Sequence, residues 1–114
     1  MKEALQEAFL MADESSPAII LKNKSWPAGI IGLLAGKLCE KYSKPSICLT
    51  THQGRLVGSC RSIPQVNIVD WLSHYSSYFV GYGGHAQAAG LTIEEDRFKA
   101  FAEEFQKDLG EWLK

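Results

Sequence analysis

The sequence predicts a mixed α/β domain of the α+β type, in which helices flank a mixed β-sheet that contains a βαβ unit and a hairpin. Residues 18–21 and 46–50 are short apolar runs typical of buried strands, and the segment between them has a helical pattern. Residues 55–60 follow the second run after a short loop, as the second arm of a hairpin does. Residues 95–113 carry apolar side chains at helical spacing, which predicts a long helix packed on the sheet.

The chain begins with apolar residues at helical spacing over residues 3–13, which predict a short helix. The turn-forming residues 15–17 end this helix. The first strand, residues 18–21, then leads through a turn into a second helix. Pro27 suits the first turn of that helix, which runs to about Tyr42.

Gly32 and Gly36 are four residues apart on the second helix and share a face, which predicts close packing on the sheet. The second strand, residues 46–50, follows. A strand–helix–strand unit favours parallel pairing, so we expect this strand to run parallel to the first. A loop at residues 51–54 then reverses the chain into the third strand, residues 55–60.

The C-terminal half contains two further helices and a fourth strand. Asn67 is the expected N-cap of a helix from residue 68 to about residue 75, with Asp70 at the third helical position. Residues 78–80 lead into a glycine-rich string, and residues 91–93 form the fourth strand. The apolar stripe of the final helix is expected to face the core.

Length and composition restrict the class of protein. The 114 residues, 46% hydrophobic and 22% charged, are enough for one globular domain with a buried core. We find neither an apolar run long enough for a membrane span nor a signal-peptide pattern, so we expect a cytoplasmic location. Cys39, Cys48 and Cys60 form no Cys-x-x-Cys pair and are interpreted as small apolar residues of a reducing compartment.

The net charge of −1 hides an uneven distribution. Residues 15–69 contain seven basic residues and one acid and so carry +6, whereas residues 70–114 carry −4 and residues 1–14 carry −3. A basic half with acidic flanks suits a polyanion bound on one face. The same distribution also fits helices and strand ends that are simply solvated, so charge alone leaves both interpretations open.

Two glycine-containing strings carry the strongest functional signal. The first, Gly83-Gly84-His85-Ala86-Gln87-Ala88-Ala89-Gly90, offers bare backbone beside one imidazole, which can donate to a phosphate oxygen or act as a general acid. In the second, Gly58-Ser59-Cys60-Arg61-Ser62, a guanidinium fits a phosphate, two hydroxyls can add donors, and the glycine can bring the chain near the ligand. Taken singly, each string also fits a structural role in a turn or at a strand end.

Other groups that could perform chemistry lack support in the sequence. His52 in the predicted hairpin loop and His74 on a predicted helix have no chemical partners nearby and are interpreted as solvent-facing. No carboxylate pair lies near a histidine in the manner of a Mg²⁺ or Mn²⁺ site, and no nucleophile has a base and an orienting acid. The sequence therefore predicts ligand-holding groups and no metal ligand, a pattern that fits half of a two-domain active site.

Three blocks of sequence together resemble the DHH-associated C-terminal domain of the DHH phosphoesterase superfamily, most closely in the RecJ family of single-strand-specific exonucleases. The blocks are Trp26-Pro27-Ala28-Gly29-Ile30-Ile31-Gly32 with the helix and Pro45 after it, then Gly58-Ser59-Cys60-Arg61-Ser62, then Gly83-Gly84-His85 with Ala88-Ala89-Gly90. The resemblance covers residues 18–113. It implies that residues 15–114 form the DHH-associated nucleic-acid- and substrate-binding domain, and that residues 1–14 are a linker helix from an absent upstream catalytic domain.

The resemblance also implies a function. In such proteins the preceding domain holds the Asp-His-His motif and Mn²⁺ or Mg²⁺, and the associated domain closes over a cleft and grips the nucleic-acid backbone. By this resemblance the phosphate-binding residues are Ser59, Arg61, Ser62, Gly83, Gly84 and His85, with His85 also assisting catalysis. The whole protein is then a metal-dependent 5′-to-3′ exonuclease for single-stranded DNA in repair and recombination. This chain alone is expected to be inactive, to bind no cofactor and to have no membrane partner.

The first block departs from the pattern of the family at one position. RecJ-type sequences often carry a histidine after the tryptophan, where this chain has Pro27, so any role of that histidine does not transfer and Trp26 is assigned to packing. Three alternatives stay open. Oligonucleotide and cyclic-dinucleotide phosphodiesterases share the second and third blocks, alanyl-tRNA synthetases carry a more distant version of the domain, and the chain could be a stand-alone nucleic-acid-binding module.

A ligand shared by both glycine-containing strings requires a particular strand arrangement. Arg61 ends the third strand, and His85 lies just before the fourth. Both side chains reach one ligand only if they lie at the same edge of the sheet. We therefore predict that these two strands, if adjacent, are antiparallel.

Overall fold

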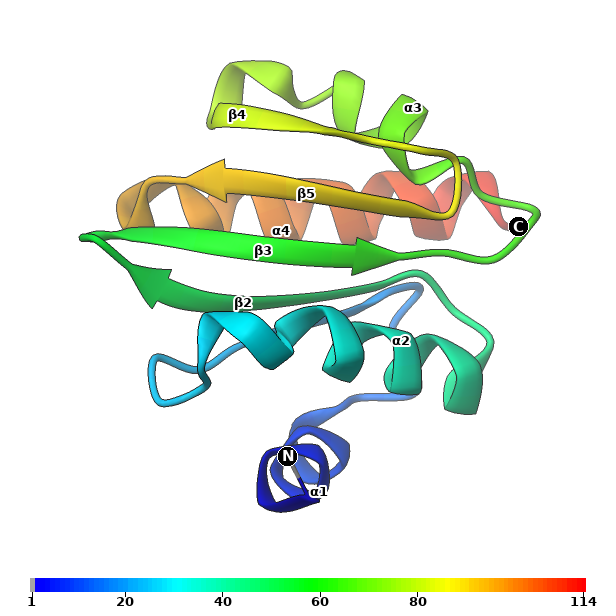
Figure 1. Ribbon diagram of the computed structural model, residues 1–114. Coiled ribbons are helices and arrows are strands. Elements are labelled where there is room, and N and C mark those ends of the chain that lie inside the picture. Colours follow the sequence, from blue (N-terminus) through cyan, green and yellow to red (C-terminus); the bar gives the residue numbers. More distant parts are fainter. Residues whose placement is uncertain (1) are drawn as a thin grey trace.

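The computed structural model describes residues 2–114 as one five-stranded sheet with helices on both faces (Figure 1). The strands lie in the order β1-β2-β3-β5-β4 across the sheet. The elements in chain order are α1 (Lys2–Met11), β1 (Ile19–Lys22), the 3₁₀ turn η1 (Ala28–Ile30), α2 (Ile31–Tyr42), β2 (Ser46–His52), β3 (Arg55–Arg61), α3 (Ile68–Ser73), the 3₁₀ turn η2 (Ser76–Tyr78), β4 (Phe79–Gly84), β5 (Ala88–Ile93) and α4 (Glu95–Trp112).

The pairing of the strands confirms the predicted mixed sheet. β1 and β2 are parallel and are connected through α2, whereas β2–β3, β3–β5 and β5–β4 are antiparallel pairs. The hairpin between β2 and β3 is tighter than the predicted four-residue loop, because both strands continue to a two-residue turn at Gln53 and Gly54.

The sheet has one strand more than the sequence predicts. Residues 79–84 form the edge strand β4, whereas the sequence predicts only that residues 78–80 lead into the glycine-rich string. Three of its six residues are glycine, which disfavours strands, so the local sequence gives little sign of it. Antiparallel pairing with β5 supplies the hydrogen bonds that hold the strand, with a bulge near Phe79.

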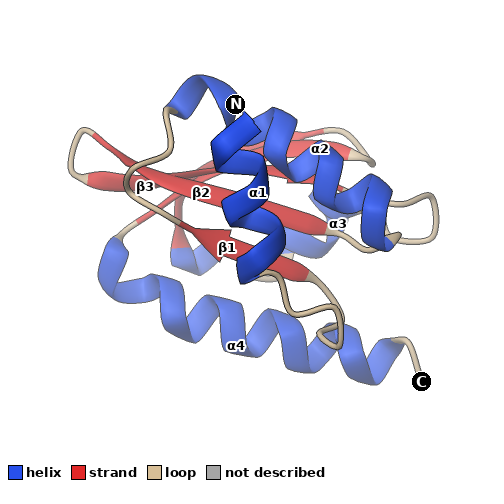
Figure 2. Cartoon of the chain, turned by 90° about the horizontal axis from the view of Figure 1, so that it is seen from below, coloured by secondary structure: helices blue, strands red, loops and turns tan. Residues whose placement is uncertain are grey.

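The two faces of the sheet are covered to different extents. α1 and α2 pack on one face and α4 on the other, as Figures 1 and 2 show, with α3 packed on the α4 side. The α2 cluster involves β1, β2 and Val57 of β3, whereas the α4 cluster extends to β5. Because α2 does not reach the far strands, β5 and β4 are left uncovered on the α2 side of the sheet.

α3 and α4 pack as their sequence patterns predict, whereas the close packing predicted at Gly36 of α2 is wrong, because a Cβ there would meet nothing within 4 Å. Phe101, Phe105 and Leu109 of α4 are fully buried, which confirms the core-facing stripe. At the start of α3, the side chain of Asn67 accepts a hydrogen bond from the backbone N–H of Asp70 at 3.1 Å, which confirms the predicted N-cap.

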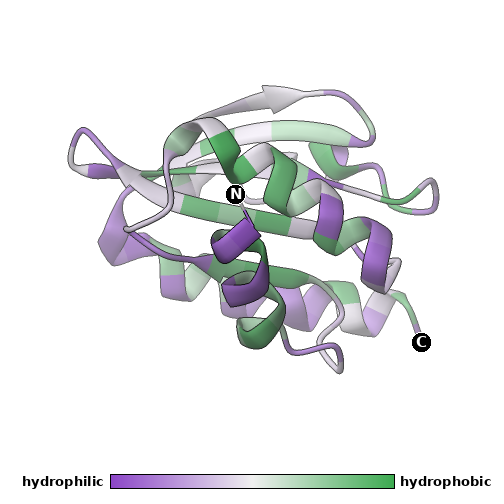
Figure 3. Cartoon of the chain, turned by 60° about the horizontal axis from the view of Figure 1, so that its bottom comes forward, coloured by the Kyte–Doolittle hydropathy of each residue, from purple (hydrophilic) through white to green (hydrophobic). Residues whose placement is uncertain are grey.

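Hydropathy follows the same layering. Figure 3 shows green, hydrophobic colour along the central strands and pale colour at the glycine-rich edge. Within residues 2–114, no helix is long and apolar enough to cross a membrane.

Cys48 and Cys60 are buried, and burial raises the pKa of each thiol to about 12. These two thiols are therefore neutral, apolar parts of the core, as the sequence predicts.

Candidate functional site

The two glycine-containing strings meet at one edge of the sheet. Arg61, the last residue of β3, pairs with Ala88, the first residue of β5, and the two strands are adjacent and antiparallel. The backbone N–H of His85 donates to the carbonyl of Ala88 at 2.7 Å, and that of Ser62 donates to Gln87 at 2.9 Å. The predicted strand arrangement is thus confirmed, and we call this end of the sheet, with Arg61 and His85, the phosphate edge.

A glycine requirement shapes the turn that presents His85. Gly84 has φ of +147°, and a Cβ there would lie 2.5 Å from both the carbonyl oxygen of Ala88 and the Cα of Ala89. Only glycine fits that conformation and that space. Gly83 differs, because it is a β4 residue paired with Gly90, and a Cβ on it would meet no atom within 4 Å. Gly84 therefore closes the turn, whereas Gly83 leaves bare backbone.

Strand alternation divides the second string between the two faces of β3. Ser59 and Arg61 project to the α2 side, because successive strand side chains point to opposite faces. Gly58 was expected to bring the chain near a ligand, but it is buried in the α4-side core, where a Cβ would lie 3.1 Å from Leu49. That expectation is wrong, and Gly58 instead makes room for core packing.

The structure does not bring Ser62 together with the other predicted phosphate ligands. Its side chain is buried, and its hydroxyl donates to the carbonyl of Val66 at 2.7 Å. This bond holds the loop between β3 and α3. Ser59 and Arg61 remain as the side chains of the second string on the α2 side.

Arg61 lies against Gly32, a glycine of α2 whose helical spacing predicts only close packing on the sheet. A Cβ on Gly32 would lie 2.9 Å from Nη2 of Arg61 and 3.7 Å from the hydroxyl of Ser59. Nη1 of Arg61 donates to the carbonyl of Cys60 at 2.8 Å, which fixes the plane of the guanidinium. Gly32 thus admits the guanidinium between helix and sheet. In the sequence, the only indication of a role for Gly32 beside Arg61 is its position in the first sequence block.

His85 completes the phosphate edge as an exposed side chain. Its imidazole makes no side-chain hydrogen bond to any other residue in the range 2–114, and Arg61 is half-buried. A half-buried guanidinium and an exposed imidazole at the same end of the sheet suit an anion that approaches from solvent. Within the same range, no group of three or more His, Cys, Asp or Glu side chains could hold a metal ion. The residues at this end of the sheet therefore suit the binding of an anion such as phosphate.

Next to the phosphate edge lies a bare stretch of sheet. It comprises the α2-side surface of β5 and β4, beside β3, and we call it the open face (Figure 1). Gly90 and Gly83 pair across β5 and β4, and Cβ atoms on Gly81 and Gly83 would meet nothing within 4 Å. The small residues leave main chain accessible to a ligand that lies flat on the sheet.

The first sequence block is structural at its tryptophan. Trp26 is buried, its indole N–H donates to the carboxylate of Glu7 at 2.8 Å, and its carbonyl accepts from the hydroxyl of Thr50 at 2.6 Å. These bonds agree with the packing role assigned from the sequence. They also tie α1, through Glu7, to the turn that precedes α2.

Two sequence strings that meet at one end of a mixed sheet are the features of a known class of domain. The chain belongs to the DHHA1 domain family, whose model matches residues 15–113. Among individual proteins it is similar to the single-stranded-DNA-specific exonuclease RecJ of Escherichia coli (strain K12), with 36% identity over 100 residues, or 83% of this chain. The structure of an exonuclease RecJ bound to manganese matches with a TM-score of 0.86 and 27% identity over 96% of this chain.

The chain spans only part of these relatives. It covers 17% of the E. coli exonuclease and 27% of the manganese-bound chain. A pGpG-specific phosphodiesterase also matches, with a TM-score of 0.68 over 96% of this chain and 38% of its own, but at 13% identity this likeness concerns the fold alone. The similarity therefore favours the RecJ type over the phosphodiesterase alternative.

Proposed function

We propose that this chain is the substrate-gripping domain of a RecJ-type exonuclease that degrades single-stranded DNA from the 5′ end in repair and recombination. In this proposal the phosphate edge holds a backbone phosphate of the strand, opposite a metal-bearing domain of the same protein. The observation that carries the proposal is the meeting of Arg61 and His85 at one edge of the sheet, beside a bare open face.

Each residue of the phosphate edge has a distinct part in the proposal. The guanidinium of Arg61 donates charge-assisted hydrogen bonds to phosphate oxygens, and the hydroxyl of Ser59 adds a donor on the same face of β3. The imidazole of His85 donates from the exposed turn and assists catalysis by stabilising developing charge. Gly83 and Gly84 let the main chain approach the nucleotide.

The hydrolytic step belongs, in this proposal, to the other domain. The relatives include structures with manganese or magnesium, and residues 2–114 hold no cluster of side chains suited to either ion. We therefore assign binding and orientation of the strand to this chain and expect it to have no nuclease activity alone with Mn²⁺. Because phosphate contacts dominate, binding is expected to be salt-sensitive and nearly independent of sequence.

Replacing Arg61 tests the proposal. We expect Arg61→Ala to weaken binding of a 5′-phosphorylated oligo(dT) by roughly 5- to 150-fold, the equivalent of about 1–3 kcal/mol for a lost charge-assisted contact. Fluorescence anisotropy at low salt, with the dye at the 3′ end, measures the affinity. Arg97→Ala is the matched control, because Arg97 lies on α4 and donates to the carbonyl of Ser77.

Activity of the whole enzyme provides the second readout. In a protein that carries this domain together with its catalytic domain, His85→Ala and Arg61→Ala should each reduce degradation of single-stranded DNA. Unchanged affinity and unchanged activity in Arg61→Ala would refute the proposed phosphate contact. Metal-dependent cleavage by the 114-residue chain alone would show that the chemistry has been assigned to the wrong domain.

A further inference from the structure

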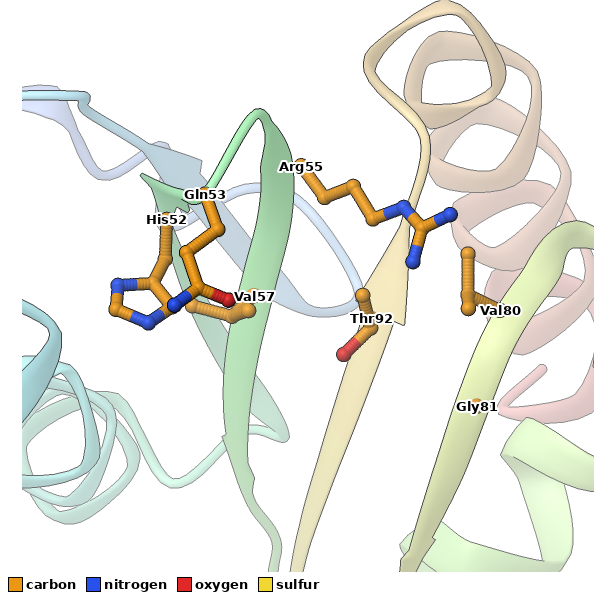
Figure 4. Close-up of a pocket in the computed structure, with 7 residues that line it drawn as sticks. All are labelled: His52, Gln53, Arg55, Val57, Val80, Gly81 and Thr92. Atoms are coloured by element: carbon orange, nitrogen blue, oxygen red, sulfur yellow. The ribbon is translucent and has the colours of Figure 1, made fainter.

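A pocket of about 380 Å³ lies on the open face, at the end far from the phosphate edge (Figure 4). We call it the hairpin pocket; it is lined by His52, Gln53, Arg55, Val57, Val80, Gly81 and Thr92. Val57 and Thr92 are register partners on β3 and β5, and Val57 is on the same side of β3 as Ser59 and Arg61. The pocket and the phosphate edge are therefore two ends of one surface.

The distance between the two ends suits an extended strand. Arg55 begins β3 and Arg61 ends it, so six residue steps separate the ends by roughly 20 Å. Between them, Gly83 and Gly90 offer no side chain. A strand held by a phosphate at one end can therefore lie across bare backbone and reach the pocket with a later nucleotide.

The charge in the hairpin pocket favours a neutral group over a second phosphate. Nε of Arg55 donates to the carboxylate of Glu94 at 2.7 Å, and this ion pair neutralises the guanidinium locally. The two Nη nitrogens make no hydrogen bond to other residues within 2–114, and Figure 4 shows the guanidinium extending from β3 toward Val80, past Thr92. A guanidinium held by one ion pair beside Val80, with Val57 on the other side of the pocket, suits a flat ring with hydrogen-bonding edges.

Gln53 occupies an unfavourable backbone position at the rim of the pocket. Its φ is +53° and that of Gly54 is +81°, as in two-residue hairpin turns that prefer Asn-Gly. Figure 4 shows the amide of Gln53 turned toward Val57. Residues held in sparsely populated conformations concentrate at ligand-binding positions, and a longer amide reaches further over the pocket than asparagine would.

We propose that the hairpin pocket binds a nucleobase of the same single strand whose phosphate is held at the phosphate edge. The base lies against Val57 and Val80 and beside the guanidinium of Arg55, while the amide of Gln53 and the hydroxyl of Thr92 meet its edge. An amide both donates and accepts, so the pocket tolerates different bases. This inference rests on the proposed function, because the strand must first be anchored at Arg61 and His85.

Amide chemical-shift mapping on the 114-residue chain tests the inference. The probes are 5′-phosphorylated (dT)₂, 5′-phosphorylated (dT)₈, and an octamer of two thymidines followed by six abasic residues. We expect all three to shift the amides of Arg61 and His85. Only (dT)₈ should also shift the amides that line the hairpin pocket, such as Val57, Gly81 and Thr92.

Two variants measure the contribution of the pocket. Arg55→Ala should bind (dT)₈ about tenfold more weakly and (dT)₂ unchanged. Gln53→Asn should weaken (dT)₈ in the same direction while keeping or raising thermal stability, because Asn-Gly is the preferred turn sequence. Gln53→Asn therefore separates lost binding from lost folding, and Arg97→Ala again controls for loss of a positive charge.

The outcomes separate the inference from the proposed function. Shifts at the phosphate edge with (dT)₈, without shifts in the pocket, would overturn the nucleobase site and leave the phosphate contact standing. Pocket shifts that persist with the abasic octamer would show that the pocket binds backbone, which also overturns the inference. No shift at Arg61 or His85 with any probe would overturn both.

Discussion

Replacing Gly32 with alanine separates the stability of this domain from its proposed grip on phosphate. A Cβ at this position would lie 2.9 Å from Nη2 of Arg61, whereas favourable carbon contacts lie at about 3.5–4.0 Å. The guanidinium must therefore move by roughly 0.6–1.1 Å. A shift of that size takes a hydrogen bond out of its usual window of about 2.7–3.2 Å. We expect Gly32→Ala to bind 5′-phosphorylated oligo(dT) about tenfold more weakly, equivalent to about 1.4 kcal/mol.

The same substitution should not destabilise the fold. Alanine is favoured over glycine within a helix by up to about 1 kcal/mol, and the atom that must give way is the far end of a flexible side chain. Gly36→Ala is the matched control, because a Cβ there meets nothing within 4 Å. This control should gain about 1 kcal/mol, or roughly 4 °C in Tm, and keep its affinity.

Urea unfolding measures the stability of both variants, and fluorescence anisotropy at low salt measures their affinity for the oligonucleotide. Wild-type affinity in Gly32→Ala would refute the inference that Gly32 admits Arg61 to a phosphate site. Equal loss of affinity in Gly36→Ala would show that α2 affects binding through some property other than this contact.

Three further predictions concern stability. Gly84→Ala should lower the free energy of unfolding, measured in urea, by about 2–3 kcal/mol, because its Cβ would lie 2.5 Å from the carbonyl oxygen of Ala88. A loss no larger than about 0.5 kcal/mol, as at an ordinary surface position, would contradict this turn geometry. Asn67→Ala should cost about 1 kcal/mol through the lost N-cap, and Asn67→Asp should restore most of it. The free energy of unfolding should fall above pH 9, by up to about 1.4 kcal/mol per pH unit for each of Cys48 and Cys60, because these thiols ionise near 9 when unfolded and near 12 when folded. Below pH 9 the folded and unfolded states both keep these protons, so the two thiols do not change the free energy of unfolding with pH. Alanine at both positions should make the decrease above pH 9 less steep. The same pH dependence in this double variant would count against the burial of the two thiols.

Sequence patterns predicted the parts of the fold that follow one simple periodicity. The apolar runs of β1 and β2 and the stripe of α4 each follow such a period, and the structure confirms them. β4 escaped prediction because Gly81, Gly83 and Gly84 have low strand propensity. Its pairing with β5 begins only three residues further along the chain, but the glycines and the bulge near Phe79 hide the alternating pattern by which such a hairpin is recognised.

The candidate site was predicted in composition more than in geometry. The sequence placed Arg61 and His85 at one edge, and the strand pairing confirms that arrangement. The sequence does not show that Ser62 has a different role from Arg61. β3 ends at Arg61, so strand alternation no longer fixes the direction of the next side chain, and the Ser62 hydroxyl donates to the carbonyl of Val66 instead. Gly32 was missed as a neighbour of Arg61 because this contact depends on the exact docking of α2 on β3.

The position of β5 between β3 and the edge strand β4 has a consequence for how the sequence of this domain can change in evolution. Ala89, Leu91 and Ile93 of β5 are buried on the α4 side, so a slip of one residue would expose all three. Such a slip would also carry the His85 turn along β3 by roughly 3.3 Å. The separation of the imidazole from the guanidinium is therefore determined by the hydrophobic interior. Substitutions at the surface can change the chemical groups that contact a ligand. Insertions or deletions within residues 88–93 would instead alter both the spacing between Arg61 and His85 and the packing of the core.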